Sequence, residues 1–326
     1  MQNSYEFNVK TPDFVKLGYI IAIANVDDKH DPSAPTNFHW KILKCRMIIF
    51  SNSSILASPD KNDCKQVHII FNKFGDDYDK ITSLFMKFSL RQINGIRETT
   101  PDVFQMCFTY TMTAKLAPLW NILGQSYLIH NRDFLTTNFP QDGVLYNVSS
   151  NEIATTLELK PIKINIIRSD DDYVPGEWVR VLPSLFKATI DDIYDKLPDS
   201  GSFKRYKDLR RHWKNIHGYR LPEEEVSSYC AVQFWRGEPL TYPKLCVLRH
   251  FPIITPIPKP AETIVLTKFV SCLKSKMSHF LGKPLTIQQV NSTNENSGLQ
   301  HTRNAAITDT QAVSLCTPTQ LHRTNF

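Results

Sequence analysis

The stretch that decides the fold class is residues 144–167, VLYNVSSNEIATTLELKPIKINII. It holds three short runs rich in aliphatic and β-branched residues, Val144 to Val148, Ile153 to Leu159 and Ile162 to Ile167, and a Ser-Ser-Asn turn separates the first two. Pro161 has no backbone N–H to donate, so its neighbourhood is expected at a sheet edge or a strand start. Short strands that follow one another this closely indicate a largely antiparallel sheet.

Further strands are expected on both sides of this stretch. The strictest alternation of apolar and polar residues runs from Phe104 to Thr113 and predicts a strand with one buried face. The same criteria predict strands at Tyr19 to Val26, Val67 to Phe71, Ser126 to His130, Tyr229 to Arg236 and Leu240 to Leu248.

Apolar residues at helical spacing predict the helices between these strands. Ser184 and Ser202 are expected as N-caps of two consecutive helices, the second of which ends at Gly218. The predicted helices are a short one after Thr11, 37–50, 78–88, 186–197, 203–217 and 266–280. Together the patterns predict an α+β fold, in which largely antiparallel sheets are covered by amphipathic helices.

The domain organisation follows from composition. Residues 1–290 are expected to form a single α+β domain, with two halves meeting near 169–176 as the alternative. Residues 291–326 are mostly Asn, Thr, Ser and Gln and predict a disordered C-terminal tail. No apolar run approaches the roughly 18 residues that a membrane-spanning helix needs, so no membrane span is expected.

The glycines exclude several kinds of ligand site. The chain has 11 glycines, and even the nearest pair, Gly282 and Gly298, stands sixteen positions apart. Dinucleotide-binding turns, phosphate-binding loops and the nucleophile elbow need closely spaced glycines. No zinc-ligand spacing occurs either, and His68 and His130 lie in or near predicted strands as structural histidines. We therefore expect no enzyme, no cofactor and no small-molecule substrate.

The cysteines indicate the compartment. The chain has seven, an odd number, and they are widely separated along the sequence. Dispersed cysteines of odd number are typical of reduced thiols in an intracellular protein. The expected localisation is therefore intracellular, either nuclear or cytoplasmic.

The predicted helix 203–217 carries the strongest charge signal. Residues 203–220 contain seven cations and one acid, a surplus equal to the +6 net charge of the whole chain. Lys204, Lys207, Arg211 and Lys214 stack opposite the apolar stripe, as in elements that contact phosphates. The alternative is a solvated helix face neutralised by the acids of residues 170–199 and 223–225. Trp213 lies on the apolar stripe and is expected in the core.

Several short motifs resemble one family, and they occur in its order along most of the chain. They are Leu116-Ala117-Pro118 with Trp120-Asn121, Arg132-Asp133-Phe134-Leu135, Val181-Leu182-Pro183-Ser184, His212-Trp213 with Gly218-Tyr219 and Leu221-Pro222, Thr241-Tyr242-Pro243, and Leu273-Lys274-Ser275-Lys276. The chain resembles the uncharacterised metazoan family of the human chromosome 18 open reading frame 63 protein (domain of unknown function 4708). The resemblance implies no activity, cofactor or catalytic residue. The family pattern lacks the dense Lys and Arg of this helix, which disfavours nucleic-acid binding as a family property.

Two functions follow as hypotheses. The first is a non-catalytic protein-interaction or scaffolding module with a protein partner, because the sequence shows no signature of catalysis. The alternative is a nucleic-acid-binding module that uses the basic helix 203–217.

Overall fold

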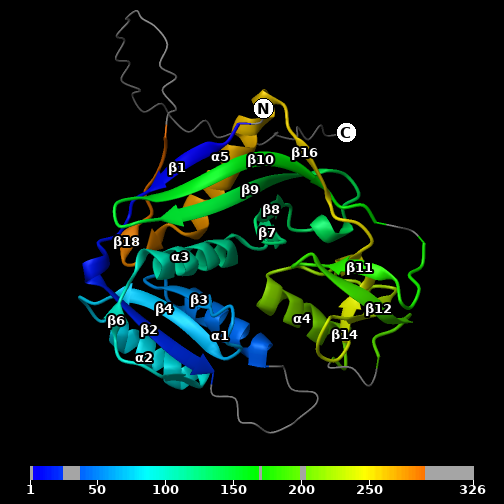
Figure 1. Cartoon of the computed structure of the whole chain (residues 1–326), viewed down its shortest axis with the longest axis horizontal. Coiled ribbons are helices and arrows are strands. Elements are labelled where there is room, and N and C mark those ends of the chain that lie inside the picture. Colours follow the sequence, from blue (N-terminus) through cyan, green and yellow to red (C-terminus); the bar gives the residue numbers. More distant parts are fainter. Residues whose placement is uncertain (1–2, 25–36, 169–170, 199–202, 291–326) are drawn as a thin grey trace, which may run out of the picture. The chain divides into compact units, whose positions relative to one another are not determined.

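The computed structural model describes residues 3–24, 37–168, 171–198 and 203–290 (Figure 1). Within these residues five α-helices lie among sheets whose strands all pair antiparallel, which confirms the predicted α+β class. The tail predicted at residues 291–326 lies outside the described residues. The division into domains stays a prediction.

The first sheet has seven strands and contains the stretch on which the fold class was predicted. Its order is β19-β1-β10-β9-β8-β7, and β16 also pairs with β10. The strands are β1 (Tyr5–Val9), β7 (Trp120–Leu123), β8 (Tyr127–His130), β9 (Gln141–Ser150), β10 (Thr155–Asn165), β16 (Ile253–Pro256) and β19 (Ile287–Gln289).

Strand β10 is one continuous strand where the sequence predicted two. On one side β9 accompanies it throughout, whereas on the other side β1 pairs with Thr155 to Leu159 and β16 with Ile162 to Asn165. Pro161 lies at the junction between β1 and β16. A proline inside the strand is therefore accommodated where one partner ends and the next begins.

The second sheet packs between helices on both of its faces. Its strands are β2 (Leu17–Ala24), β3 (Leu56–Pro59), β4 (Gln66–Asn72), β5 (Leu90–Gln92) and β6 (Arg97–Glu98), in the order β3-β4-β2-β5 with β6 beside β2. Alternate residues of β4 face opposite ways, so Ile69 packs with α1 (Asn37–Ser51) and α2 (Asp77–Phe88), and Ile70 packs with α3 (Pro101–Leu116).

The strand predicted at Phe104 to Thr113 is wrong, because this segment is the middle of helix α3. Thr100 caps the helix by accepting a hydrogen bond from the backbone N–H of Val103, and Pro101 occupies the first turn. Helix α3 packs between the first and second sheets, as Figure 1 shows. A helix buried on opposite sides has no simple amphipathic period, and its apolar residues then imitate the alternation of a strand.

The third sheet has five strands, and one of them was predicted as a helix. Its order is β14-β13-β12-β11-β15. The strands are β11 (Trp178–Val181), β12 (Phe186–Tyr194), β13 (Tyr229–Gln233), β14 (Leu240–Pro243) and β15 (Val247–Leu248). Strand β12 replaces the helix predicted over 186–197, because its backbone pairs with β11 and β13 and its Ala188 and Ile190 alternate into the core.

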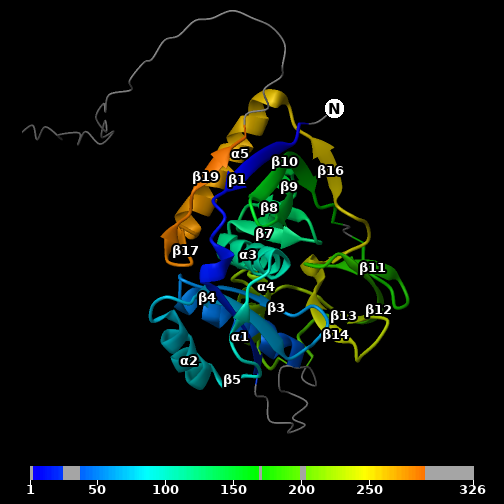
Figure 2. The same cartoon turned by 60° about the vertical axis from the view of Figure 1, so that its left-hand side comes forward.

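Helix α5 (Lys259–Lys276) completes the core of the first sheet. It contacts β9, β10 and α3 (Figure 2), and its Phe269 ring lies 5.0 Å from that of Trp120. A small hairpin of β17 (His279–Phe280) and β18 (Lys283–Pro284) follows. The remaining helix, α4 (Tyr206–His217), packs against the third sheet and the loop region after β8, where Trp213 and Tyr219 join Phe134 in one cluster.

Candidate functional site

Helix α4 exposes a cationic face because its other face is buried. Tyr206, Leu209, Trp213 and Ile216 are buried, as the stripe in the sequence predicted. Gly218 ends the helix in the left-handed conformation with a φ of 77°, so the predicted C-terminal cap is confirmed. Trp213 is a core residue, and the cations must project from the opposite side.

The structure brings together three of the four predicted contact residues. Lys204, Lys207, Arg211 and Lys214 are all exposed. Lys207, Arg211 and Lys214 line one large groove, whereas Lys204 lines a smaller one near the start of the helix. The candidate site therefore extends along α4 from Lys207 to Lys214.

The large groove has a volume of about 1400 Å³ and lies between α4 and α1. Helices α1 and α4 are in contact, and the end of α2 and the segment after α3 also contribute lining residues. Its lining consists of Leu43, Arg46, Met47, Phe50, Ser51, Lys87, Phe88, Ala117, Pro118, Arg132, Lys207, Arg210, Arg211, Lys214, Asn215, Gly218, Tyr219, Arg220, Leu221 and Glu223. We call this the basic groove.

The charge of the basic groove is strongly one-sided. Among its described lining residues, eight are Lys or Arg and one, Glu223, is acidic. Cations that line one concave surface add their fields in the same direction and attract an anion from solution. The arrangement is therefore suited to binding a polyanion.

The acids near α4 neutralise only part of this charge. Glu223 lies 3.9 Å from Arg210 and 3.1 Å from Arg220, and Asp208 pairs with Arg205 at 3.0 Å. Among the described residues, no carboxylate lies within ion-pair distance of Lys207, Arg211 or Lys214. The neighbouring acids thus pair with Arg205, Arg210 and Arg220, and among the described residues they leave Lys207, Arg211 and Lys214 without an ion pair.

Three of the groove's eight cations, Arg46, Lys87 and Arg132, lie outside the cationic run of residues 203–220 and were missed from the sequence. Arg46 comes from α1, Lys87 from α2, Arg132 from the segment after β8, and Arg220 from the segment after α4. Arg220 belongs to the cationic run 203–220, whereas the other three lie far from it in the sequence, and only the tertiary fold brings them beside α4. A close approach of backbone contributes as well, because a Cβ at Gly218 would lie 2.7 Å from the Cβ of Ala117 and 3.3 Å from Nη2 of Arg46.

A cluster of three histidine rings in edge-to-face contact joins helices α1 and α4. The ring of His39 on α1 lies 4.7 Å from that of His212 on α4, and the ring of His217 lies 6.1 Å from that of His212. Burial lowers the pKa of His212 to about 4, and the neighbouring His39 adds to the effect. Burial also holds the pKa of His39 below and that of His217 well below their usual values. All three rings are therefore neutral at pH 7.

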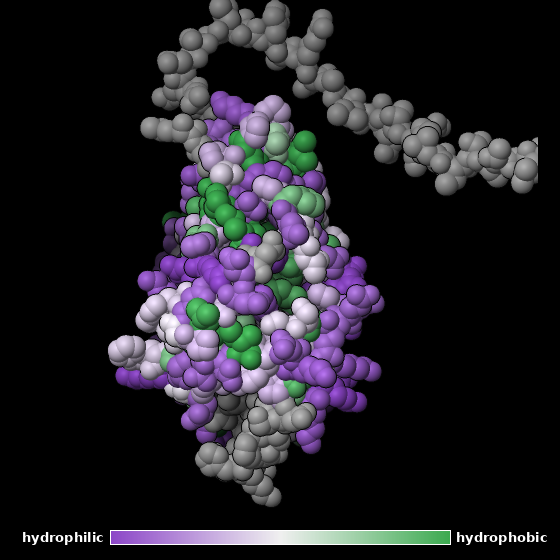
Figure 3. Space-filling view, turned by 90° about the vertical axis from the view of Figure 1, so that its right-hand side faces the viewer, coloured by the Kyte–Doolittle hydropathy of each residue, from purple (hydrophilic) through white to green (hydrophobic). Residues whose placement is uncertain are grey.

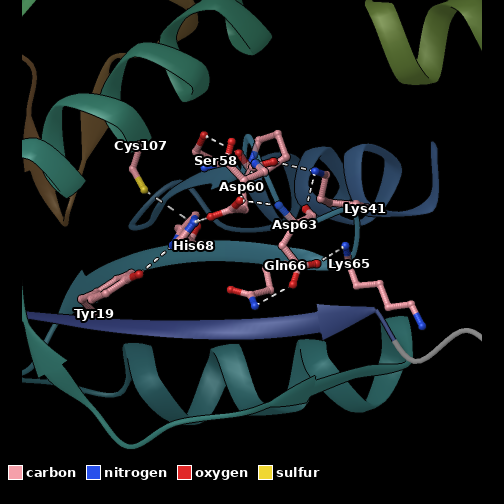
Figure 4. A network of polar contacts seen from close by, with 11 residues as sticks. Tyr19, Lys41, Ser58, Asp60, Asp63, Lys65, Gln66, His68 and Cys107 are labelled. Carbon is pink, nitrogen blue, oxygen red and sulfur yellow. Dashed lines mark hydrogen bonds and ion pairs between the residues drawn. The ribbon is translucent and has the colours of Figure 1, made fainter. Parts of the chain in front are cut away.

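A second polar network lies between β2, β4 and the segment after β3 (Figure 4). The hydroxyl of Tyr19 lies 2.6 Å from Nδ1 of His68, whose Nε2 lies 2.7 Å from Oδ2 of Asp60. Burial raises the pKa of Asp60, but hydrogen bonds from the Asp63 backbone, from His68 and from the Asn62 backbone outweigh it and lower the pKa to about 2.

Tyr19, His68 and Asp60 form a hydrogen-bonded chain with the residue types of a catalytic relay, but two of these side chains are buried away from any substrate. Tyr19 and His68 are each 7% exposed, so a substrate cannot reach the reacting atoms without opening the sheet. The geometry agrees with the structural histidine expected at position 68. Among the described residues no group of three His, Cys, Asp or Glu side chains is arranged to hold a metal ion, and no helix is long and apolar enough to cross a bilayer.

The chain belongs to the family described as "Domain of unknown function (DUF4708)", which matches residues 4–170 and 165–256. These two segments carry all three sheets' principal strands and helices α1 to α4, including the basic groove.

Three solved structures show a distant likeness. The Argonaute of Marinitoga piezophila, in complex with a 5′ OH guide RNA and target DNA, is 6% identical with a TM-score of 0.33 over 84% of this chain and 34% of that one. The same protein with guide RNA alone is 10% identical with a TM-score of 0.35 over 82% and 34%. The A. aeolicus Argonaute is 10% identical with a TM-score of 0.32 over 91% and 44%. The chain thus spans less than half the length of these proteins.

Proposed function

We propose that this protein binds the phosphate backbone of nucleic acid in the basic groove. The observation that carries the proposal is the meeting of Lys207, Arg211 and Lys214 with cations of four other segments on one concave surface. Lys and Arg on such a surface displace the counterions of a phosphate chain, and this release supplies most of the affinity of sequence-independent binding.

The size of the groove favours a polymer over a small anion. Pockets for small ligands occupy roughly 300 to 1,000 Å³, and the basic groove is larger, at about 1400 Å³. Its cations come from five separate segments: α1, α2, α4, the segment after β8 and the segment after α4. A chain of phosphates can reach several of them at once, whereas a single phosphate group cannot.

Fluorescence anisotropy with a labelled DNA strand of about 15 nucleotides tests this proposal. The variant K207E/R211E should weaken binding at low salt by more than about tenfold, since it replaces attraction by repulsion at two phosphate contacts. The control K274E/K276E makes the same charge change on α5, outside the groove, and should bind nearly as the wild type does. Absence of wild-type binding at low salt, or equal losses in both variants, would overturn the proposal.

A protein-interaction or scaffolding role is the second candidate, supported by exposed aromatic residues on the third sheet. Trp178 of β11, Phe186 of β12 and Trp235 after β13 are exposed, Trp235 to 92%. Figure 3, which faces this side, shows hydrophobic residues in several separate patches among hydrophilic ones. Exposed aromatic side chains are frequent at protein interfaces.

The scaffolding role predicts a stoichiometric protein partner. Purification from native cells should return one with the wild type and lose it with W178A/W235A. Recovery of the wild-type chain alone would count against this role.

Both candidates are binding functions, and we propose that the protein acts without catalysis. The six described cysteines are all free, which supports an intracellular location, nuclear or cytoplasmic. Membership in the metazoan branch named after chromosome 18 open reading frame 63 remains part of this proposal.

A further inference from the structure

Phe50 stands out among the aromatic residues of the basic groove. The groove's other two aromatic side chains in the described residues, Phe88 and Tyr219, are 4% and 0% exposed and belong to the core. Phe50 lies in the last turn of α1 and is 59% exposed although it lines the groove. Leaving a large apolar ring in water is unfavourable. A ligand that covers the ring of Phe50 therefore gains free energy from its burial.

The neighbours of Phe50 orient it beside the cations. The guanidinium of Arg46, one turn earlier on α1, lies 5.4 Å from the centre of the Phe50 ring. Arg46 also approaches the end of α4, since a Cβ built at Gly218 would lie 3.3 Å from Nη2 of Arg46. The aromatic ring and a guanidinium plane therefore occupy one wall of the groove, and Lys207, Arg211 and Lys214 occupy the other.

We propose that the ligand of the basic groove is an unpaired nucleic-acid strand, one base of which stacks on Phe50 while the α4 cations hold its phosphates. This inference rests on the proposed function and adds the kind of nucleic acid. Bases of a single strand offer their flat faces to aromatic side chains, and such stacking is tolerant of sequence. Bases in a duplex are already stacked on one another, so a duplex could use only the cations.

The test compares three ligands of equal length by fluorescence anisotropy: a mixed-sequence DNA strand, the same strand with abasic sites throughout, and the duplex. The wild type should bind the strand more tightly than the abasic strand. F50A should weaken binding of the strand by on the order of tenfold and leave the abasic strand unchanged. F50W should retain the affinity. The matched control is F74A, which removes an exposed phenylalanine outside the groove and should change neither affinity.

The outcomes separate the inference from the proposed function. If F50A weakens the two single-stranded ligands equally, or weakens neither, or if the duplex binds best, the stacking inference is overturned and the phosphate contacts stand. If no nucleic acid binds the wild type, or if only anionic vesicles or phosphopeptides bind, both fail. Circular dichroism and the urea midpoint show whether F50A has a folding defect. If it has one, F50W decides the inference, because this variant must still bind the strand more tightly than the abasic strand.

Discussion

Acidification should weaken the contact between α1 and α4, because the histidine cluster that joins them is neutral in the folded protein. The ring of His212 lies against those of His39 and His217, and Arg46 is a nearby cation that opposes protonation of His217. Protonating any of them adds a positive charge to a buried, already basic region. The perturbation to apply is therefore a change from pH 7.5 to pH 5, with His212→Gln as the variant that removes one titrating ring.

The magnitude follows from the pKa of His212. Burial lowers it from 6.5 to about 4 in the folded protein, so the unfolded chain binds the proton more readily. The contribution of neutral His212 to the unfolding free energy is complete above about pH 6.5 and is lost as the pH falls toward 4. At 1.36 kcal/mol per pKa unit, the wild type should lose about 2 kcal/mol of unfolding free energy at pH 5 through His212 alone. His217, whose pKa burial holds even lower, adds to the loss.

Urea denaturation at pH 7.5 and pH 5, followed by tryptophan fluorescence, measures this difference. The loss between the two pH values should be about 2 kcal/mol smaller in H212Q than in the wild type. H279Q changes an exposed histidine in the β17–β18 hairpin and should follow the wild type. A wild type and an H212Q variant that lose the same free energy on acidification would refute the reasoning, whatever their stabilities at pH 7.5.

Three further changes test single features of the fold by their urea midpoints. G218A should cost at least about 1 kcal/mol, because the residue needs a φ of 77° and its new Cβ would lie 2.7 Å from that of Ala117. T100A should cost about 1 kcal/mol by removing the N-cap of α3, and a neutral effect would contradict the helix start. D60N should cost about 1 kcal/mol of unfolding free energy at pH 7. The difference from the wild type should shrink below pH 4, because the wild-type carboxylate, whose pKa is lowered to about 2, then becomes protonated. A difference that grows on acidification would contradict this role of Asp60.

Local signals in the sequence were sufficient for the two faces and the C-terminal end of α4, although the helix begins at Tyr206 with Arg205 as its N-cap and not after Ser202. Its apolar stripe, its basic face and Gly218 all lie within one segment, and each reports on the helix itself. The antiparallel sheets were predicted for a similar reason, since the hairpin of β9 and β10 pairs residues close in sequence. In these places the local preference and the tertiary environment agree.

The errors lie where tertiary packing determines the structure. Helix α3 carries a cap signal at Thr100, Pro101 and Asp102, of the kind that predicts a helix, but burial between two sheets gave its apolar residues a strand-like alternation. Strand β12 has a helical spacing of apolar residues, yet its Ile190 pairs with Val232 of β13, about forty residues later. Neither partner can be identified from the segment alone.

The basic groove could be predicted only in part for the same reason. The cations of α4 form a pattern in the sequence, whereas Arg46, Lys87 and Arg132 are isolated residues in segments 70 or more positions away. The exposed ring of Phe50 gives no signal either, because it continues the apolar run of α1. What identifies the site is the surface that these segments form together.

The salt dependence of binding tests the central claim most directly. For a single strand, the logarithm of the affinity should fall with the logarithm of the salt concentration by about 0.7 for each phosphate contacted. The double variant K207Q/R211Q removes two of these contacts, so the magnitude of its slope should be about 1.4 smaller than that of the wild type. Binding that does not depend on salt, or a slope that K207Q/R211Q leaves unchanged, would contradict the assignment of the basic groove as a phosphate-binding surface.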